Sequence, residues 1–251
     1  MTESTRTLLE TKNLVKRYGA LVATRDLSFA IKAGTTHAVI GPNGAGKTTL
    51  VAQISGFVRP TSGSVYFDGA DITALSPWQR SQVGLARSFQ ITNIFLDLSV
   101  EDNVALAVQA HAGHSFRMLR PARTLASLRE PAQTILKRIG LFSRRHEQAA
   151  RLSHGEKRQL ELAMALVVEP KMLLLDEPLA GMGTEEAQRI IALLLQLKRE
   201  RTILLIEHDI DAVFAVADEI SVLVSGSIIS TGTPVQIRSD PEVRKAYLGD
   251  S

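Results

Sequence analysis

The stretch GPNGAGKTTL, residues 41–50, places three glycines within six positions and follows them with a lysine and two threonines. It is preceded by THAVI (36–40), a short, apolar and partly β-branched run that is typical of a buried strand. It runs into LVAQISGF (50–57), in which apolar residues recur at helical spacing and Gly56 stands where a helix can end. The stretch is therefore predicted to form a loop between a strand and a helix.

This loop has the pattern G-x-x-x-x-G-K-[ST] of a phosphate-binding loop. Glycines let the backbone adopt positive φ and bring bare N–H groups close to an anion, and the N-terminus of the following helix adds partial positive charge. Lys47 is expected to reach the β- and γ-phosphates of a nucleoside triphosphate, and the hydroxyl of Thr48 to bind Mg²⁺. A glycine-rich turn without a ligand is the alternative, and the strand, lysine, hydroxyl and helix together argue against it. The predicted nucleotide-binding residues of the loop are Gly41, Pro42, Asn43, Gly44, Ala45, Gly46, Lys47, Thr48 and Thr49.

A second motif, KMLLLDEPLAG (171–181), brings an apolar run up to two adjacent acids. Such a run suits a strand of a parallel sheet covered by helices on both faces, and ligands bind at the carboxyl ends of such strands. Asp176 is predicted to hold Mg²⁺ and Glu177 to polarise the attacking water as a general base. Adjacent strand residues point opposite ways, so this assignment requires the backbone to turn just after Asp176, and Pro178 favours such an exit. The alternative is a solvated acidic pair at a strand end.

A third motif, RLSHGEKRQLELAMAL (151–166), is predicted to begin a helix. Ser153 stands at the N-cap position and Glu156 follows three residues later, which is a capping box. The box has a purely structural explanation, but a capped helix N-terminus with Ser153 and Gly155 is also an anion site.

With these three motifs, the chain resembles the nucleotide-binding subunit of an ABC transporter over nearly its whole length. LSHGE resembles the family's signature, which is usually L-S-G-G-Q. His154 stands at the position of the first glycine, and Glu156 stands at the position of the glutamine. Gln90 in RSFQ resembles the glutamine of the Q-loop, and His208 in LLIEHD resembles the switch histidine. Tyr18 in LVKRYGA resembles the aromatic residue that stacks on adenine.

The resemblance implies two subunits packed head to tail, with each ATP held between the phosphate-binding loop of one and the signature helix of the other. It implies that Gln90 touches Mg²⁺ or water and that His208 contacts the γ-phosphate. In total it implies catalytic roles for Glu177, His208 and Gln90, nucleotide contacts from Tyr18, Ser153, Gly155 and Glu156 besides the loop, and Mg²⁺ ligation by Thr48, Gln90 and Asp176.

The segment after DEP departs from the family pattern S-A-L-D, because Met182 stands where the family often has an aspartate. This A-G-[LM] variant, together with LARSFQITNIFLDLSVEDNV (85–104) and VRKAYLGD (243–250), resembles the ATPases of branched-chain amino acid importers. Importers of urea and short amides are very similar. Two other classes stay open: a soluble ABC ATPase acting on nucleic acid or ribosomes, and a metabolite kinase with a phosphate-binding loop.

The predicted fold is α/β: a P-loop NTPase core with a mainly parallel sheet, an antiparallel β-subdomain from residues 8–35 and 64–73, and an inserted helical subdomain. We expect one nucleotide-binding domain over 1–251, with the core in 1–97 and 169–251 and the helical subdomain in 98–168. A further helix is expected to bury one apolar face made of Ala187, Ile191, Leu194 and Leu195.

Composition restricts the partners. The 251 residues include no cysteine, which excludes disulfides and cysteine-ligated zinc. A formal charge of +3 is weak evidence for nucleic acid, so no nucleic-acid partner is expected. The longest apolar run, 162–168, is far shorter than the ~20 residues of a membrane-spanning helix. The resemblance implies a peripheral subunit on the cytoplasmic face of the inner membrane. Its implied partners are a second ATP-binding subunit, two integral membrane permeases and, indirectly, an extracytoplasmic solute-binding protein.

Overall fold

A computed structural model of the chain describes residues 6–87, 94–111 and 126–248. Within these ranges the larger sheet has six strands in the order β10-β9-β3-β8-β7-β6. All neighbours in it pair in parallel except β10 with β9, as expected for a mainly parallel sheet. The strands are β3 (Thr36–Ile40), β6 (Leu85–Arg87), β7 (Met172–Asp176), β8 (Thr202–Ile206), β9 (Glu219–Val224) and β10 (Ser227–Gly232).

The predicted antiparallel sheet is confirmed in the order β2-β1-β4-β5. Gly19 has a φ of 59° between β1 and β2, and Asp68 and Gly69 have φ of 55° and 81° between β4 and β5, so both hairpins turn where the sequence indicated. The strands are β1 (Thr7–Tyr18), β2 (Leu21–Lys32), β4 (Ser62–Phe67) and β5 (Ala70–Asp71).

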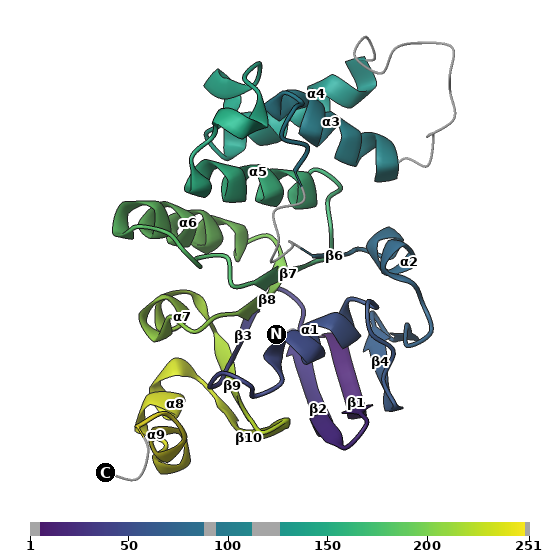
Figure 1. Ribbon diagram of the computed structural model, residues 1–251, viewed down its shortest axis with the longest axis vertical. Helices are drawn as coiled ribbons and strands as arrows, with labels where there is room; N and C mark the ends of the chain where they lie inside the picture. The colour runs from purple at the N-terminus through teal and green to yellow at the C-terminus, as the bar shows by residue number, and fades with distance from the viewer. Residues whose placement is uncertain (1–5, 88–93, 112–125, 249–251) are drawn as a thin grey trace, which may run out of the picture.

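The helices gather in two regions along the long axis of the molecule (Figure 1). At one end lie α3 (Val100–His111), α4 (Ala126–Arg138) and α5 (His154–Leu166), with 3₁₀ turns at Phe142–Arg144 and Ala149–Arg151. Around the sheets lie α1 (Lys47–Ile54), α2 (Pro77–Gln82), α6 (Thr184–Leu197), α7 (Ile210–Val216), α8 (Pro234–Ser239) and α9 (Pro241–Leu248). The division of the chain at 97/98 and 168/169 stays a prediction.

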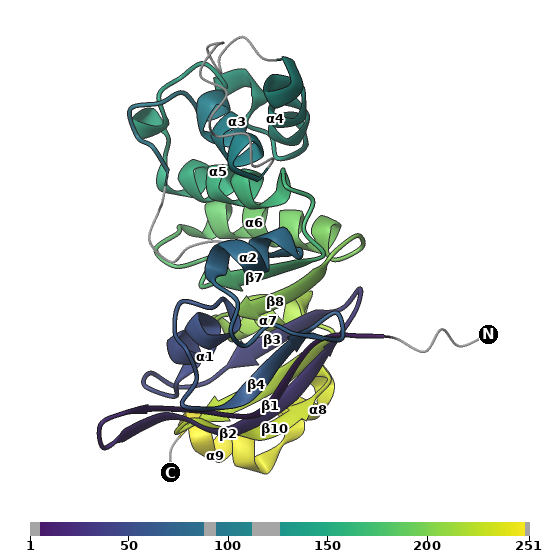
Figure 2. The ribbon, with the colours of Figure 1, turned by 90° about the vertical axis from the view of Figure 1, so that its right-hand side faces the viewer.

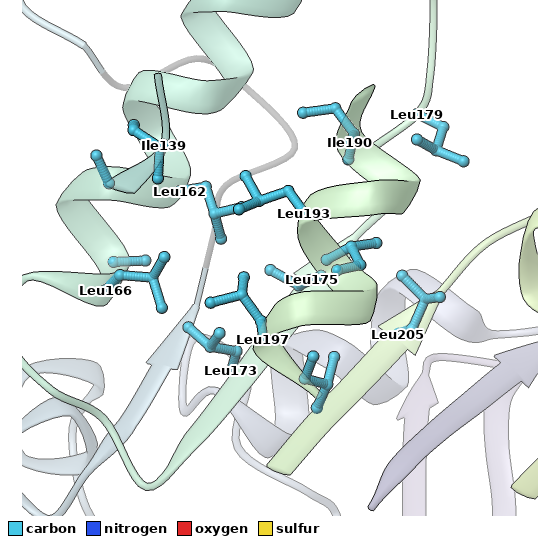
Figure 3. Close-up of a cluster of buried hydrophobic side chains, with 14 of the residues drawn as sticks. Ile139, Leu162, Leu166, Leu173, Leu175, Leu179, Ile190, Leu193, Leu197 and Leu205 are labelled. Atoms are coloured by element: carbon cyan, nitrogen blue, oxygen red, sulfur yellow. The ribbon is translucent and has the colours of Figure 1, made fainter. Parts of the chain in front are cut away.

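Strand β7 is buried on both faces, and this burial fixes the position of the two acids at its end. Leu173 and Leu175 point to one face of the sheet, where they join a cluster of leucines and isoleucines from α5, α6 and neighbouring segments (Figure 3). Met172 and Leu174 point to the other face, into a second cluster with α1 and the antiparallel sheet. Helices therefore lie on both faces as expected, and on the second face strands of the antiparallel sheet lie beside α1.

The apolar face predicted for α6 is partly wrong. The buried residues of α6 are Ile190, Leu193, Leu194 and Leu197. Leu195 keeps 39% of its surface exposed. Ile190 and Leu197 lie seven positions apart and define the stripe that packs on the sheet, whereas Leu195 lies off it.

Candidate functional site

The predicted phosphate-binding loop connects β3 to α1 at the carboxyl edge of the sheet. Gly46 precedes α1 with a φ of 105°, and Gly44 has a φ of 79° with open space around its Cα. A Cβ on Gly41 would lie 2.1 Å from the carbonyl oxygen of Leu223, and one on Gly46 would lie 2.2 Å from that of Ala23. Gly41 and Gly46 are therefore required by the close approach of β9 and β2, and Gly44 by its backbone conformation.

Lys47 is buried in this loop and is held by the loop itself. Its Nζ donates to the carbonyl oxygens of Gly41 at 2.6 Å and Pro42 at 3.1 Å. Burial lowers the pKa of Lys47, and the negative charges of Glu177 and Asp176 oppose that shift. The ammonium thus lies in the field of both acids, which brings the first two sequence motifs together. Thr48 is exposed in the first turn of α1, where its hydroxyl is open to a ligand.

The backbone turn required after Asp176 is confirmed. Strand β7 ends at Asp176, and Glu177 has a φ of 50°, a left-handed conformation that a glutamate rarely adopts. The N–H of Glu177 donates to the carbonyl of Ile206 at 2.9 Å, which fixes the turn against β8. Because of this turn, the side chain of Glu177 does not have to point to the opposite face from that of Asp176, as the next residue of a regular strand would. A strained backbone at the proposed general base is consistent with a functional role.

Asp176 is buried at the sheet edge and is paired with a residue that sequence reasoning missed. Arg87, the last residue of β6, places a guanidinium nitrogen 3.1 Å from an Asp176 carboxylate oxygen. Burial raises the pKa of Asp176, and Arg87 opposes the shift. The signal available in the sequence was Arg87 itself, which is the first residue of the motif RSFQ.

The oxygen ligands at this edge fit Mg²⁺. Asp176 and Thr48 offer a carboxylate and a hydroxyl, and a hard cation such as Mg²⁺ prefers oxygen. Among the described residues, no group of three or more His, Cys, Asp or Glu is placed to hold a metal.

His208 lies two residues after the end of β8, at the same edge of the sheet as the acid pair. Its side chain is 60% exposed, and its Nδ1 lies 3.7 Å from Glu207.

The neighbouring Glu207 is fully buried and accepts from the backbone N–H groups of Leu179 at 2.9 Å and His208 at 3.0 Å. Burial raises the pKa of Glu207, and these bonds oppose the shift. Glu207, which sequence reasoning overlooked, therefore ties the loop after β7 to the loop after β8. Like Asp176, it directly follows an apolar strand, and that pattern was visible in the sequence.

The capping box at the start of α5 is confirmed. The hydroxyl of Ser153 accepts from the N–H of Glu156 at 3.2 Å, and the carboxylate of Glu156 accepts from the N–H of Ser153 at 2.8 Å. Glu156 is also bound by Arg144 at 2.7 Å. Its side chain is thus engaged within the chain, and its contact with nucleotide stays a prediction.

Two further predicted site residues lie elsewhere. Tyr18 ends β1 with 48% of its surface exposed, and the ammonium of Lys16 lies 5.0 Å from its ring centre. An exposed ring is open to stacking on a base. Gln90 lies outside the described residues.

A comparison with known families identifies this arrangement. A family model described as ABC transporter matches residues 24–180, more than half of the chain. The chain belongs to the ABC transporter ATPases. A second model, described as branched-chain amino acid ATP-binding cassette transporter, matches residues 227–251.

Individual relatives agree with this assignment. The high-affinity branched-chain amino acid transport ATP-binding protein LivG of Salmonella typhimurium is 36% identical, over 97% of this chain and 98% of its own length. The lipopolysaccharide export system ATP-binding protein LptB of Acidithiobacillus ferridurans is 33% identical, over 97% of each chain. A crystal structure of an ATP-binding cassette of an ABC transporter in its ADP conformation superposes with a TM-score of 0.85 at 31% identity, over 98% of this chain and 100% of that one.

Two departures of this ABC ATPase from the common family pattern have a structural account. His154 donates from Nε2 to the carbonyl of Ala180 at 3.2 Å, which connects the signature helix to the loop after β7. Met182 is partly buried against the main hydrophobic cluster. Where the family often has a glycine and an aspartate, this chain therefore has a contact within the subunit and a partly buried apolar side chain.

Proposed function

We propose that this ABC ATPase works as a head-to-tail dimer in which the signature helix of one protomer completes the nucleotide site of the other. The proposal is supported by the separation of the two motifs within one chain. In both Figure 1 and Figure 2, α5 and α1 lie apart along the long axis, with β7 and α6 at levels between them. Ser153 and Gly155, at the start of α5, thus lie apart from their own phosphate-binding loop, so a second subunit (a copy or a paralogue) is needed to bring them to ATP.

In the proposed reaction the residues of this edge have separate tasks. The loop's N–H groups and Lys47 hold the phosphates. Glu177 accepts a proton from the attacking water as the water oxygen bonds to the γ-phosphorus, and the bond between that phosphorus and the oxygen bridging to the β-phosphate breaks, so that ADP and phosphate are released. His208 and Gln90 help to order that water. When bound through Thr48, Asp176 and Gln90, Mg²⁺ neutralises charge that develops on the phosphate oxygens. Hydrolysis removes the contact that joins the two subunits, and the pair opens.

Transport requires a membrane partner, since no described helix is both long enough and apolar enough to cross a bilayer. A groove of about 320 Å³ lies between α2, β6, α3 and α5 and is lined mainly by apolar side chains. Trp78 and Phe57, which line it, are 62% and 53% exposed. Arg87, which is paired with Asp176, also lines it. We propose that a cytoplasmic segment of the permease subunit docks in this groove, because a segment there touches a residue bonded to the nucleotide site.

Replacing Trp78 with alanine is expected to reduce recovery of the permease with this subunit at least about tenfold, since an anchoring tryptophan at the centre of an interface contributes about 2 kcal/mol or more. The measurement is co-purification from detergent extracts. Val235→Ala is the matched control, because Val235 is 78% exposed on α8, far from the groove. ATP hydrolysis by the isolated subunit is expected to stay unchanged in both variants. Equal permease recovery with both variants would contradict docking in the groove.

We propose import of branched-chain or other hydrophobic amino acids as the transport function, at the cytoplasmic face of the inner membrane. The match of residues 227–251 to the branched-chain model, together with the likeness to LivG, carries this proposal. The likeness to LptB means that the nucleotide-binding part alone does not select a cargo. Urea and short amides are the alternative cargo.

The test is uptake into proteoliposomes that contain this subunit, its permeases and its solute-binding protein, with ATP inside. Labelled leucine is expected to accumulate, whereas labelled urea and acetamide are not. A Glu177→Gln subunit should abolish uptake. Accumulation of urea alone, or none with any amino acid, would overturn the cargo assignment and leave the ATPase assignment intact.

A further inference from the structure

The N-terminus of the signature helix α5 is already occupied by a carboxylate of the same chain. One oxygen of Glu186 accepts from the hydroxyl of Ser153 at 3.1 Å and from the N–H of Gly155 at 3.4 Å. These are the two groups that the proposed function assigns to the partner's ATP. A carboxylate and a phosphate both satisfy such donors with negative charge, so they compete for the same place.

The two donors do not serve both anions at once. A Cβ built on Gly155 would lie 2.8 Å from the carboxylate carbon of Glu186, so the carboxyl group packs directly against the glycine. The cavity beside them, lined also by Glu156 and Arg189, measures about 10 Å³. Ser153 and Gly155 each have one hydrogen to donate, and both are directed at the same Glu186 oxygen. A phosphate reaches Ser153 and Gly155 only after the side chain of Glu186 has moved away.

Glu186 is held there by a second helix. It lies in the first turn of α6, whose N-cap residue Gly183 supplies no side-chain hydrogen bond. The carboxylate therefore lies at the positive ends of both α5 and α6, and each stabilises a negative charge.

We propose that Glu186 controls access to the signature helix: it occupies the γ-phosphate position in the separate subunit and is displaced by the partner's ATP when the dimer closes. This inference rests on the proposed head-to-tail dimer. The ATP concentration at which subunits associate then reflects a competition between phosphate and Glu186. Each dimer contains two such sites, so the cost of displacement enters the association equilibrium twice.

Glu186→Gln is the informative variant, because the amide oxygen still accepts from Ser153 and Gly155 while the negative charge is removed. Neutral hydrogen bonds are about half as strong as charge-assisted ones, so the amide is a weaker competitor. We expect the ATP concentration for half-maximal dimerisation to fall about threefold to tenfold. Glu185→Gln is the matched control, because Glu185 is the preceding residue of α6 and its side chain is 90% exposed, with only a 3.5 Å contact to Arg189.

The experiment measures dimerisation by sedimentation velocity during an ATP titration, with every protein carrying Glu177→Gln so that ATP persists. Thermal unfolding without nucleotide checks that both variants are folded. A leftward shift for Glu186→Gln and none for Glu185→Gln supports the inference. Equal midpoints for the two variants, or a higher midpoint for Glu186→Gln, would overturn it. If the Glu177→Gln parent fails to dimerise at any ATP concentration, the head-to-tail proposal itself is wrong, so the two failures are distinguishable.

Discussion

Replacing Glu177 with glutamine is expected to lower ATP turnover at least about 100-fold while leaving ATP binding intact, which is the loss typical of removing a general base. The amide keeps the size of the carboxylate but does not accept a proton from water. The turn that presents the side chain does not depend on the carboxylate, because it is fixed by the backbone bond from Glu177 to Ile206. ATP should therefore still enter and hold two subunits together.

Two measurements check this prediction: steady-state phosphate release, and the oligomeric state at saturating ATP. The variant should accumulate as an ATP-bound dimer. The matched control is Glu169→Gln, since Glu169 is exposed and has the same left-handed φ of 50°. The control separates loss of the proton acceptor from any effect of placing glutamine in that conformation. Turnover near that of the unaltered protein in the Glu177 variant would remove Glu177 from the role of base.

The parts of the site that were predicted from the sequence depend on neighbours along the chain. The phosphate-binding loop, the turn after Asp176 and the capping box of α5 each lie within about ten residues, so the spacing of residue types specifies them. The turn was predicted from the separate tasks of the two acids, because adjacent residues of a strand point opposite ways, and from Pro178, which favours a strand exit. The hairpins between strands likewise show in their turn residues.

The parts that were missed are contacts between distant segments. Arg87 and Asp176 are 89 residues apart in sequence, and Ser153 and Glu186 are 33 apart. Local pattern carries no information on such pairs. Glu186 in particular reads as an ordinary acid in the first turn of a helix, where the helix dipole favours it. Only the packing of α6 beside α5 shows that its carboxylate reaches the residues proposed to bind the partner's nucleotide.

Arg80 was also missed, and it carries the second large prediction. It is 1% exposed, and its guanidinium donates to the carbonyls of Gln53 at 2.7 Å and Ile54 at 2.6 Å, at the end of α1. It also donates to the carbonyls of Thr73 and Leu75. Burial lowers the pKa of Arg80 to about 10, so the group remains a cation at neutral pH. A buried cation at a helix C-terminus satisfies carbonyls that lack partners within the helix.

Arg80→Met is expected to reduce the free energy of unfolding by about 3 kcal/mol or more, because several buried carbonyls lose their donor and each costs about 1–3 kcal/mol. For a chain of this size that corresponds to a fall in the thermal midpoint of about 6–12 °C. Differential scanning calorimetry without nucleotide provides the measurement. Arg59→Met, at an exposed arginine in the same region, is the control and should stay within about 0.5 kcal/mol of the unaltered protein.

Arg80→Lys distinguishes the role of the charge from that of the fork-shaped guanidinium. Lysine keeps the cation at the end of α1, but a single ammonium does not reach carbonyls on both α1 and the segment after β5, so an intermediate loss of stability is expected. Because α1 begins at Lys47, loosening its far end should also weaken ATP binding, measured with a fluorescent analogue below the melting range. Arg80→Met with the stability of Arg59→Met would contradict the capping role. Unchanged stability in Arg80→Lys would instead show that positive charge alone holds the helix end, since lysine supplies the charge without the paired donors.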